Sequence, residues 1–290
     1  MQVSILADSL NPAGVRLTTM KVVFPRCILA EFNTHRAFSR NSASSRAQPI
    51  STVIKKVKES PFIPLRWMKQ HKGMQGSEYF EDPEIVELLV QKWLAARDAA
   101  VQSAQSFLKV DGFNDVTKQM VNRLLEPFLY HEVIVTATDW ENFFAIRNHP
   151  DAEIHIQKLA EMMMEAYNAS TPKKLATLEW HIPFSDRMDK EKLEELCKEK
   201  GISQEEAQLR ISTARCARIS YGLVDDEKSF DYVKDWNLCK SLAEGGHWSP
   251  FEHCAYADSN KQYVGNFRGF VQYRKLHDNE NRRDDRVIQK

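Results

Sequence analysis

Alternating apolar and β-branched residues at the start of the chain are typical of β-strands. Two such runs, residues 3–10 and 17–32, lie on either side of a turn that contains Pro12 and Gly14. Residues 264–275 follow a similar pattern, with Gly269 at the position of a bulge. We therefore expect a sheet whose second strand leads directly into the segment after Phe32.

Apolar residues recur every three or four positions in much of the remaining chain, which predicts amphipathic helices. Asp82 followed by Pro83 is a strong helix start, and the pattern continues to about residue 108. The same spacing, together with capping residues, predicts further helices at residues 116–125, 139–147, 151–168, 189–200, 203–212 and 229–244.

The composition favours a globular protein that handles small molecules. The 290 residues include 40 basic and 40 acidic side chains, so the formal net charge is zero. This balance argues against a nucleic-acid partner and favours a small anionic ligand. The longest apolar runs are too short to span a bilayer, and the N-terminus has no basic leader, so we expect no membrane association.

Cysteine usage predicts a cytoplasmic location and no metal. The five cysteines are odd in number and scattered, with no Cys-x-x-Cys pair, which suits a reducing compartment. Cys216, Cys239, His247 and His253 could in principle hold zinc, but their spacing matches no zinc pattern.

One stretch departs from the neutral balance. Residues 32–58 contain no aspartate or glutamate, but they include Arg36, Arg40 and Arg46. Arginine side chains offer forked donors that suit phosphate or carboxylate, and several serines in the stretch add hydroxyl donors. No glycine lies between residues 14 and 73, which excludes a glycine-rich phosphate loop here. The stretch therefore predicts either an anion site or a solvated basic loop.

Three stretches together resemble the flavin-dependent thymidylate synthases, the ThyX family. They are Thr34-His35-Arg36 with Ser44 and Arg46; Arg123-Leu-Leu-Glu-Pro127 with Asn142-Phe-Phe-Ala-Ile-Arg147; and Ala217-Arg-Ile-Ser-Tyr221 with Gly246-His-Trp-Ser-Pro-Phe-Glu-His253. In that family the third stretch precedes the first, whereas here it follows. The order predicts a circular permutation, and hence that His247 and Glu252 lie beside His35 and Arg36.

The resemblance implies an α+β fold: a ThyX-like mixed sheet with flanking helices, in permuted order. It implies a single catalytic domain over residues 1–290, with a helical insertion at about 49–115 and a connector at about 172–210. It also implies a homotetramer that converts dUMP to dTMP. Methylenetetrahydrofolate would be the carbon donor, and NADPH would reduce a bound FAD. The cofactors then carry the difficult chemistry, while the protein positions and polarises.

The resemblance also assigns roles to individual residues. Arg147 is the expected catalytic residue, because it would contact the uracil and stabilise negative charge that develops on the ring. The expected substrate-binding residues also include Glu31, Ser42, Ser44, Arg46 and Arg123, with Ser44, Arg46 and Arg123 at the phosphate. The expected cofactor-binding residues are Thr34, His35, Arg36, Asn142, Ser220, His247, Ser249 and Glu252.

Several positions depart from the family pattern. Thr34 stands where the family has arginine, Ser42 where glutamate is usual, Glu31 where glutamine is common, and Ala47 where tyrosine is usual. These changes leave open a flavin-dependent hydroxymethylase that acts on dUMP or dCMP, or a non-catalytic nucleotide-binding homologue. Purely structural roles also remain open, because Arg123 lies near a helix end and Ser249 with Glu252 forms a capping-box pattern.

Overall fold

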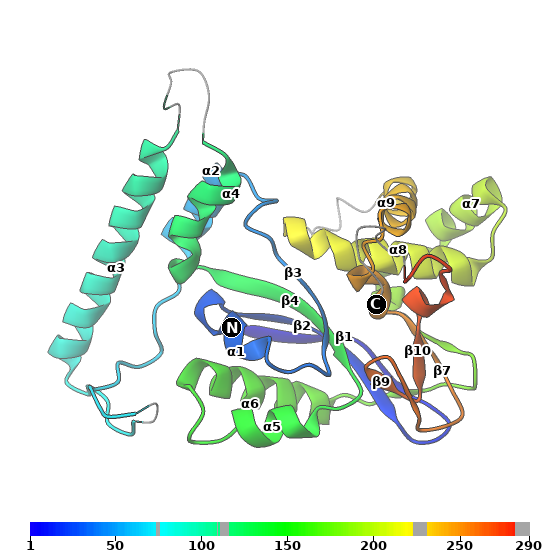
Figure 1. Cartoon of the computed structure of the whole chain (residues 1–290), viewed down its shortest axis with the longest axis horizontal. Coiled ribbons are helices and arrows are strands. Elements are labelled where there is room, and N and C mark those ends of the chain that lie inside the picture. Colours follow the sequence, from blue (N-terminus) through cyan, green and yellow to red (C-terminus); the bar gives the residue numbers. More distant parts are fainter. Residues whose placement is uncertain (74–75, 109, 111–115, 223–230, 282–290) are drawn as a thin grey trace, which may run out of the picture.

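A five-stranded mixed sheet lies at the centre of the computed structural model (Figure 1). The structure describes residues 1–73, 76–108, 110, 116–222 and 231–281. The strands of this sheet are β1 (Gln2–Leu10), β2 (Arg16–Pro25), β3 (Ser39–Ser42), β4 (Tyr130–Ala137) and β5 (Lys173–Lys174). Their order is β3-β4-β2-β1-β5, and all neighbours are antiparallel except β1 and β5. The α+β class expected from the sequence is confirmed.

The predicted second strand is shorter than expected. β2 ends at Pro25, and residues 26–32 form a 3-10 turn (Arg26–Ile28) followed by α1 (Leu29–Phe32). Proline has no N–H for the ladder, and the Leu-Ala-Glu sequence that follows favours helix. The strand prediction for residues 26–32 was therefore wrong, and α1 rather than a strand end leads into the basic stretch.

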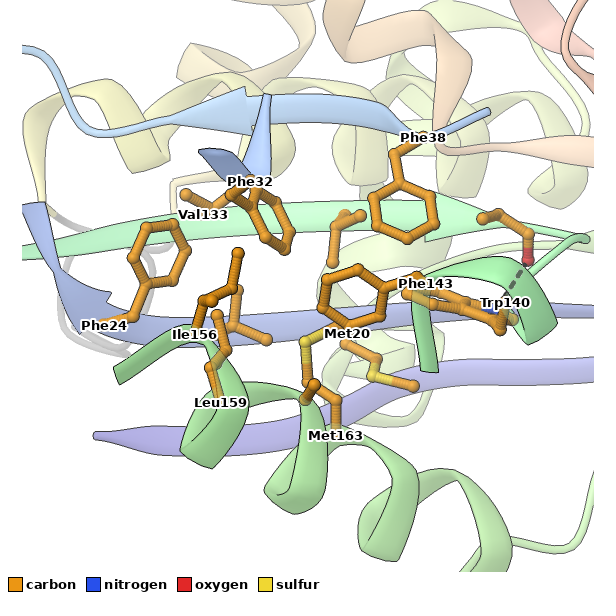
Figure 2. Close-up of a cluster of buried hydrophobic side chains, with 14 of the residues drawn as sticks. Met20, Phe24, Phe32, Phe38, Val133, Trp140, Phe143, Ile156, Leu159 and Met163 are labelled. Atoms are coloured by element: carbon orange, nitrogen blue, oxygen red, sulfur yellow. Dashed lines mark hydrogen bonds between the residues drawn. The ribbon is translucent and has the colours of Figure 1, made fainter. Parts of the chain in front are cut away.

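One face of the sheet packs on two helices, α5 (Glu141–Arg147) and α6 (Ile154–Ala169). Figure 2 shows Met20, Val133 and Phe143 among the buried side chains of this layer. Trp140 closes one end of the layer, and its Nε1 donates a 3.0 Å hydrogen bond to the carbonyl of Ala137. We call this side of the sheet the apolar face.

The opposite face lies against α8 (Gln204–Arg218), where Leu6, Ile134 and Cys216 share a smaller buried cluster. Outside α8 lie α7 (Lys190–Lys200) and α9 (Tyr232–Glu244). A second sheet, in the order β10-β7-β6, consists of β6 (Trp180–His181), β7 (Ala255–Ala257) and β10 (Phe270–Gln272). A hairpin of β8 (Tyr263–Val264) and β9 (Phe267–Arg268) adjoins it.

The helices of the predicted insertion pack beside the sheet. They are α2 (Ile50–Glu59) and α3 (Pro83–Ser106), followed by α4 (Lys118–Val121). α3 forms the outer edge of the molecule in Figure 1. Its start is as predicted, because the Asp82 side chain accepts hydrogen bonds from the N–H groups of Glu84 and Ile85. Residues 74–75, 109 and 111–115 of the predicted insertion lie outside the described residues. Its status as an insertion stays a prediction.

Three other boundaries differ from expectation. The helix predicted from residue 151 begins at Ile154, because Glu153 rather than Asp151 provides its N-cap. The helix predicted at 116–125 is α4 followed by a 3-10 segment, Asn122–Phe128, which contains Pro127. The strand predicted at 264–275 is divided into short pieces at Gly265 and Gly269, both with positive φ. Residues 229–230 of the last predicted helix lie outside the described part of the chain.

Candidate functional site

Arg147, at the end of α5, is held by the segment that follows α1. Its Nε donates to Nε2 of His35 at 3.0 Å, and its Nη2 donates to Oγ1 of Thr34 at 3.3 Å. Its Nη1 lies 3.4 Å from a carboxylate oxygen of Glu31. The structure thus brings together four predicted site residues from segments more than 100 positions apart in the sequence.

His35 is neutral in this arrangement. Burial, and next the positive charges of Arg147 and Arg40, lower the pKa of His35 to about 4. A neutral imidazole can accept the hydrogen bond from Arg147 at Nε2 while Nδ1 keeps the proton. The ring also packs edge-on against Phe143, with 4.8 Å between the ring centroids. His35 therefore orients the Arg147 guanidinium as a neutral hydrogen-bond acceptor and does not neutralise its positive charge.

Arg40 has a structural role that the sequence did not suggest. Its Nη1 donates to the carbonyls of Phe32 and His35, at 3.2 and 3.1 Å. The Phe32 carbonyl is at the C-terminal end of α1, where helical hydrogen bonds run out, and the His35 carbonyl lies in the loop that follows. Arg40 thus caps α1 and fixes the loop that carries Thr34 and His35, whereas we expected it to be a donor for an anion.

Ser42, Ser44, Arg46 and Arg123 line one hollow of about 400 Å³. We call it the arginine pocket. Arg123 comes from the 3-10 helix Asn122–Phe128, and the serines come from the end of β3 and the loop after it. Arg46 and Arg123 are both exposed, so their guanidinium groups can reach a ligand. The pocket combines arginine side chains with short hydroxyl donors, which suits an anionic group, and the one carboxylate in its lining, Glu126, is paired with Arg26.

The same pocket contains Arg26 and His131, which sequence reasoning missed. Arg26 donates to Nδ1 of His131 at 2.9 Å and forms a 2.9 Å ion pair with Glu126. Burial, and next the Arg26 charge, lower the pKa of His131 to about 3. A basic residue directly after the proline that ends β2 was the available signal for Arg26. His131 looked like an ordinary strand residue.

The late segment meets the early one beside β3. Ser220 accepts a 3.1 Å hydrogen bond at its carbonyl from the N–H of Ser44, and its Oγ donates to the carbonyl of Ser42 at 3.4 Å. Ser249 lies next to the side chain of Asn41, whose amide nitrogen reaches Oγ and the carbonyl oxygen of Ser249 at 3.2 and 3.1 Å. The predicted early and late stretches therefore meet within a single subunit.

Not every predicted residue joins these groups by a described contact. Glu252 forms an ion pair with Arg274. Burial lowers the pKa of Arg40, and the Glu252 carboxylate opposes this shift from nearby. Within the described chain, no hydrogen bond or ion pair joins His247 to His35 or Arg36. Arg36, Asn142 and His247 are exposed.

The late stretch is also not the helix start that its capping-box pattern suggested. Ser249 lies inside the short 3-10 helix Ser249–Glu252, and the position before it is Trp248, which provides no side-chain cap. Proline at the second position still suits the first turn of such a helix. The conformation leaves the Ser249 hydroxyl exposed beside Asn41 rather than buried in a cap.

Two further observations concern metal ions and membranes. In the described residues, no group of three or more His, Cys, Asp or Glu side chains could hold a metal ion. No helix within the described ranges combines the length and the apolar character needed to cross a membrane.

Comparison with protein families now assigns the chain to a class. The family model described as "Thymidylate synthase complementing protein" (Thy1) matches residues 14–173, more than half of the chain. The chain therefore belongs to the Thy1 family, to which the ThyX proteins also belong. The first two of the three predicted stretches lie inside the matched residues, and the third lies outside them.

Similar solved structures include PolB from Streptomyces cacaoi, described as a UMP/dUMP methylase. With 5-Br dUMP bound, it is 17% identical with a TM-score of 0.43, and the match covers 52% of this chain and 66% of that one. With 5-Br UMP bound, the values are 15%, 0.45, 57% and 87%. ThyX from Helicobacter pylori, complexed with FAD and dUMP, is 15% identical with a TM-score of 0.33, covering 52% and 67%.

In the first of these comparisons the match spans slightly less than two thirds of the PolB chain. A search of curated proteins found no match. The assignment to the family therefore depends on the family model alone.

Proposed function

We propose that this protein is a flavin-dependent enzyme that methylates C5 of a pyrimidine nucleotide, most directly dUMP to dTMP. The carbon donor is methylenetetrahydrofolate, and NADPH reduces FAD. The observation that carries the proposal is the arginine pocket, which gathers Ser42, Ser44, Arg46 and Arg123 into one hollow. In this proposal Ser44, Arg46 and Arg123 hold the phosphate of dUMP, and Ser42 and Glu31 lie along the nucleotide.

The fixed position of Arg147 supports a catalytic role. Three hydrogen-bond partners, Glu31, Thr34 and His35, leave its guanidinium little freedom, and its side chain keeps 21% exposure toward a ligand. A cation that is already oriented stabilises charge developing on the pyrimidine without reorganising during the reaction. His35, neutral at physiological pH, keeps that cation in place.

The proposed flavin contacts come from the loop after α1, from α5 and from the late stretch. Arg36, Asn142, His247 and Ser249 are exposed polar groups. Such side chains can bind a diphosphate and the polar edge of an isoalloxazine ring. Thr34, His35, Ser220 and Glu252 are the other proposed contacts. Thr34, in place of arginine, removes one positive charge, so Arg36 carries more of the phosphate binding. Reduced flavin would supply the hydride.

We further propose that the order of the motifs reflects a circular permutation within one catalytic domain, with the connector at about 172–210. The contacts of Ser220 with Ser42 and Ser44 support this proposal, because they join the late stretch to the family-matched region. An experimental structure superposed on a ThyX enzyme tests it. Residues 14–173 and 204–272 should superpose together as one body, and independent placement of the two pieces would refute the permutation. By family analogy the assembly is a homotetramer, which light scattering of the purified protein checks.

The first experiment is the absorbance spectrum of the purified protein. Bound FAD gives a yellow protein whose absorbance bleaches with NADPH, and a colourless protein that binds dUMP would indicate a non-catalytic homologue. Arg147→Ala should retain folding and flavin but lose turnover about 10²-fold or more, because it removes charge stabilisation that acts in the transition state. Arg187→Ala, at an exposed arginine far along the chain, is the matched control. Full activity of Arg147→Ala would refute the role of Arg147.

Glu31 favours a second candidate, a flavin-dependent hydroxymethylase that acts on dCMP. A carboxylate beside Arg147 is an acceptor suited to the exocyclic amine of cytosine. Water, rather than hydride, would then resolve the one-carbon unit. Product analysis from dUMP and from dCMP, each with and without NADPH, separates the two candidates.

A further inference from the structure

The three arginines of the arginine pocket are held in different ways. Within the described residues, the guanidinium groups of Arg46 and Arg123 form no hydrogen bond or ion pair, and both residues are exposed. The Arg26 guanidinium instead lies 2.9 Å from Nδ1 of His131 and 2.9 Å from a carboxylate oxygen of Glu126, and its side chain is only 21% exposed. Arg26 is therefore a cation whose position is set before any ligand binds.

The strand register explains why Arg26 reaches His131. Phe24 of β2 and His131 of β4 are directly opposite each other, so their side chains share one face of the sheet. The N–H of Arg26 donates to the carbonyl of Leu129 at 2.9 Å, so the backbone pairing continues one residue past Pro25. Side chains two positions apart in an extended chain point the same way, so Arg26 follows Phe24 toward His131.

His131 holds Arg26 as a neutral acceptor. Arg26 can only donate, so Nδ1 of His131 accepts the bond and the ring proton is on Nε2. The pKa of His131, lowered to about 3 first by burial and then by the Arg26 charge, leaves the ring uncharged near neutral pH. The ring therefore orients the guanidinium and leaves its positive charge available to a ligand.

Arg26 also keeps donors for a ligand. A guanidinium has five N–H groups, and in the described part of the chain one of them donates to His131. No nitrogen of Arg26 is among the buried, unpaired polar atoms of the described residues, so its other donors meet solvent or Glu126. A ligand in the pocket can therefore bond to Arg26 while both existing contacts stay in place.

The loop that provides the serine hydroxyls is fixed as well. The buried Asn122 side chain donates to the carbonyl of Ser45 at 2.8 Å, and the N–H of Ser44 donates to the carbonyl of Ser220 at 3.1 Å. Ser44 and Ser45 line the pocket together with Arg26. Groups that are already in place lose little freedom when a ligand binds, so they contribute more to its affinity and selectivity.

The charge of the pocket matches a phosphate monoester. Its described lining contains three arginines and one glutamate, besides the neutral His131, which gives a formal charge of +2. A terminal phosphate carries about −1.5 to −2 at pH 7 and has three acceptor oxygens. A phosphodiester carries a single negative charge and has fewer free oxygens. Both the charge and the number of donors therefore favour the monoester.

We propose that Arg26 is a phosphate-binding residue that selects a phosphate monoester, and that His131 and Glu126 are the positioning residues that hold it. The inference rests on the proposed function for the nucleotide, and it adds a residue that the family resemblance did not indicate. Arg46 and Arg123, as exposed side chains, attract any anion. Arg26 contributes the fixed donors that distinguish a monoester from a diester.

The test compares dUMP with its methyl phosphodiester, by isothermal titration calorimetry of the full chain. The native protein should bind dUMP at least roughly 10-fold more tightly than the diester. Arg26→Gln should weaken dUMP binding by roughly 10- to 100-fold, as expected for lost hydrogen bonds to a charged group, and diester binding by far less. Arg26→Lys keeps the charge but not the fork, so it should recover only part of the affinity. Equal loss for both ligands in Arg26→Gln would overturn the selective role.

A charge-matched variant separates fixed donors from net charge. Arg26→Gln combined with Glu126→Gln leaves the formal charge of the pocket at +2, from the other two arginines. This double variant should bind dUMP about as weakly as Arg26→Gln and should show little preference over the diester. Native-like binding would show that net charge alone matters, and would overturn the inference. Arg66→Gln, at an arginine paired with Glu81 outside the pocket, should bind both ligands as the native protein does.

A double-mutant cycle tests the positioning role of His131. His131→Phe keeps a ring but removes the acceptor, and should weaken dUMP binding roughly 5-fold; in the Arg26→Gln background it should add nothing, because His131 acts through Arg26. His131→Asn, which retains an acceptor close to the backbone, should recover most of the loss. A penalty of equal size in both backgrounds would overturn the positioning role. If Arg26→Gln does not fold, Arg26→Lys replaces it in the cycle and in the comparison of ligands.

Inorganic phosphate separates the inference from the proposed function, because its binding needs neither a pyrimidine nor a flavin. Arg26→Gln should weaken its binding, read by ³¹P NMR, as it weakens that of dUMP. Phosphate binding that depends on Arg26, in a protein that neither binds FAD nor turns over dUMP, would overturn the proposed function alone. Turnover of dUMP with an unchanged KM in Arg26→Gln would overturn the inference alone. A native protein without affinity for phosphate or dUMP would overturn both.

Discussion

The two faces of strands β2 and β4 carry different kinds of side chain, although alternate residues of the same two strands form both faces. On one face Met20, Val22 and Val135 pack against α6 with no polar partner between them. On the other face, Thr19 and Thr136 bond to each other. Thr19 also bonds to His181, and Thr136 bonds to His253. Neighbouring residues of one strand thus meet entirely different surroundings, because successive side chains point to opposite faces.

The contrast shows that the two faces contribute differently to the stability of the fold: one through buried apolar area, the other through hydrogen bonds with fixed partners. The apolar face contributes free energy through buried area, which is insensitive to direction and to pH. The polar face can at best recover the cost of burying its groups, and it is stable only while every donor has an acceptor. We therefore expect the two faces to respond to different perturbations, in the following order of size.

Acid should destabilise the protein through His181 and His253 on the polar face, in addition to His35 and His131, whose pKa burial also lowers. The pKa of His181 and His253 is about 3 in the folded protein, against about 6.5 when unfolded, so between these values only the unfolded state binds the two protons. Stability should fall as the pH is lowered from 6.5, by roughly 5 kcal/mol at pH 4.5 for the two rings together. Urea unfolding at several pH values measures this.

The control for the acid effect is His149→Gln, because His149 is an exposed histidine on neither face. It should leave the pH dependence unchanged, whereas His181→Gln should make the decline clearly shallower. Equal slopes for His181→Gln and the native protein would mean that His181 titrates normally in the folded state.

Truncation on the apolar face should have the next largest effect. Phe143 is 1% exposed and contacts Phe32, Phe38 and His35 by its ring. Phe143→Ala should lower the free energy of unfolding by about 3–5 kcal/mol at every pH, through lost burial and a cavity. Leu88→Ala, at an exposed apolar residue of α3, should cost little. A loss for Phe143→Ala that grows with acid would contradict the separation of the two faces.

A break in the line of hydrogen bonds through Thr19 and Thr136 should have a moderate effect. Thr136→Val keeps the shape of the side chain but leaves His253 Nδ1 and Thr19 Oγ1 without one partner each, so we expect a loss of about 1–3 kcal/mol. Thr136→Ser should retain most of the stability. Denaturant unfolding at neutral pH decides between them, and a valine variant as stable as the serine variant would show that the bonds contribute little.

A helix cap away from both faces gives the smallest effect and a baseline. Asp82→Ala removes the acceptor for two N–H groups of α3 and should cost about 1 kcal/mol. Asp82→Asn, which keeps an acceptor, should be nearly neutral. Thermal unfolding of the two variants measures the difference, and identical transitions would remove the assigned capping role.

Much of the local structure could be predicted from the sequence. The start of α3 at Asp82-Pro83 and the end of α7 at Gly201 follow from short-range rules that need no partner. The strand prediction failed at Pro25, and the N-cap of α6 was misplaced, because competing caps and breakers only a few residues apart are decided by packing.

The candidate site was partly predictable. The family pattern indicated Arg46, Arg123 and Arg147 by their residue types, but it could not show that Arg40 caps α1 while Arg26 enters the arginine pocket. Both are arginines in or near the same basic stretch. Only the folded path of the backbone decides that the Arg40 guanidinium bonds to backbone carbonyls whereas the Arg26 guanidinium lines the arginine pocket.

The sequence by itself indicated the fold class through its resemblance to a known family, and it showed the basic stretch and the residues available for anion binding through its composition. Tertiary structure alone decided that Ser220 and Ser249 lie beside β3, and that Thr19 and Thr136 connect two histidines more than 70 positions apart. The physical reason is that strand register fixes long-range contacts: a one-residue slip of β2 against β4 would turn Thr19 to the face opposite Thr136.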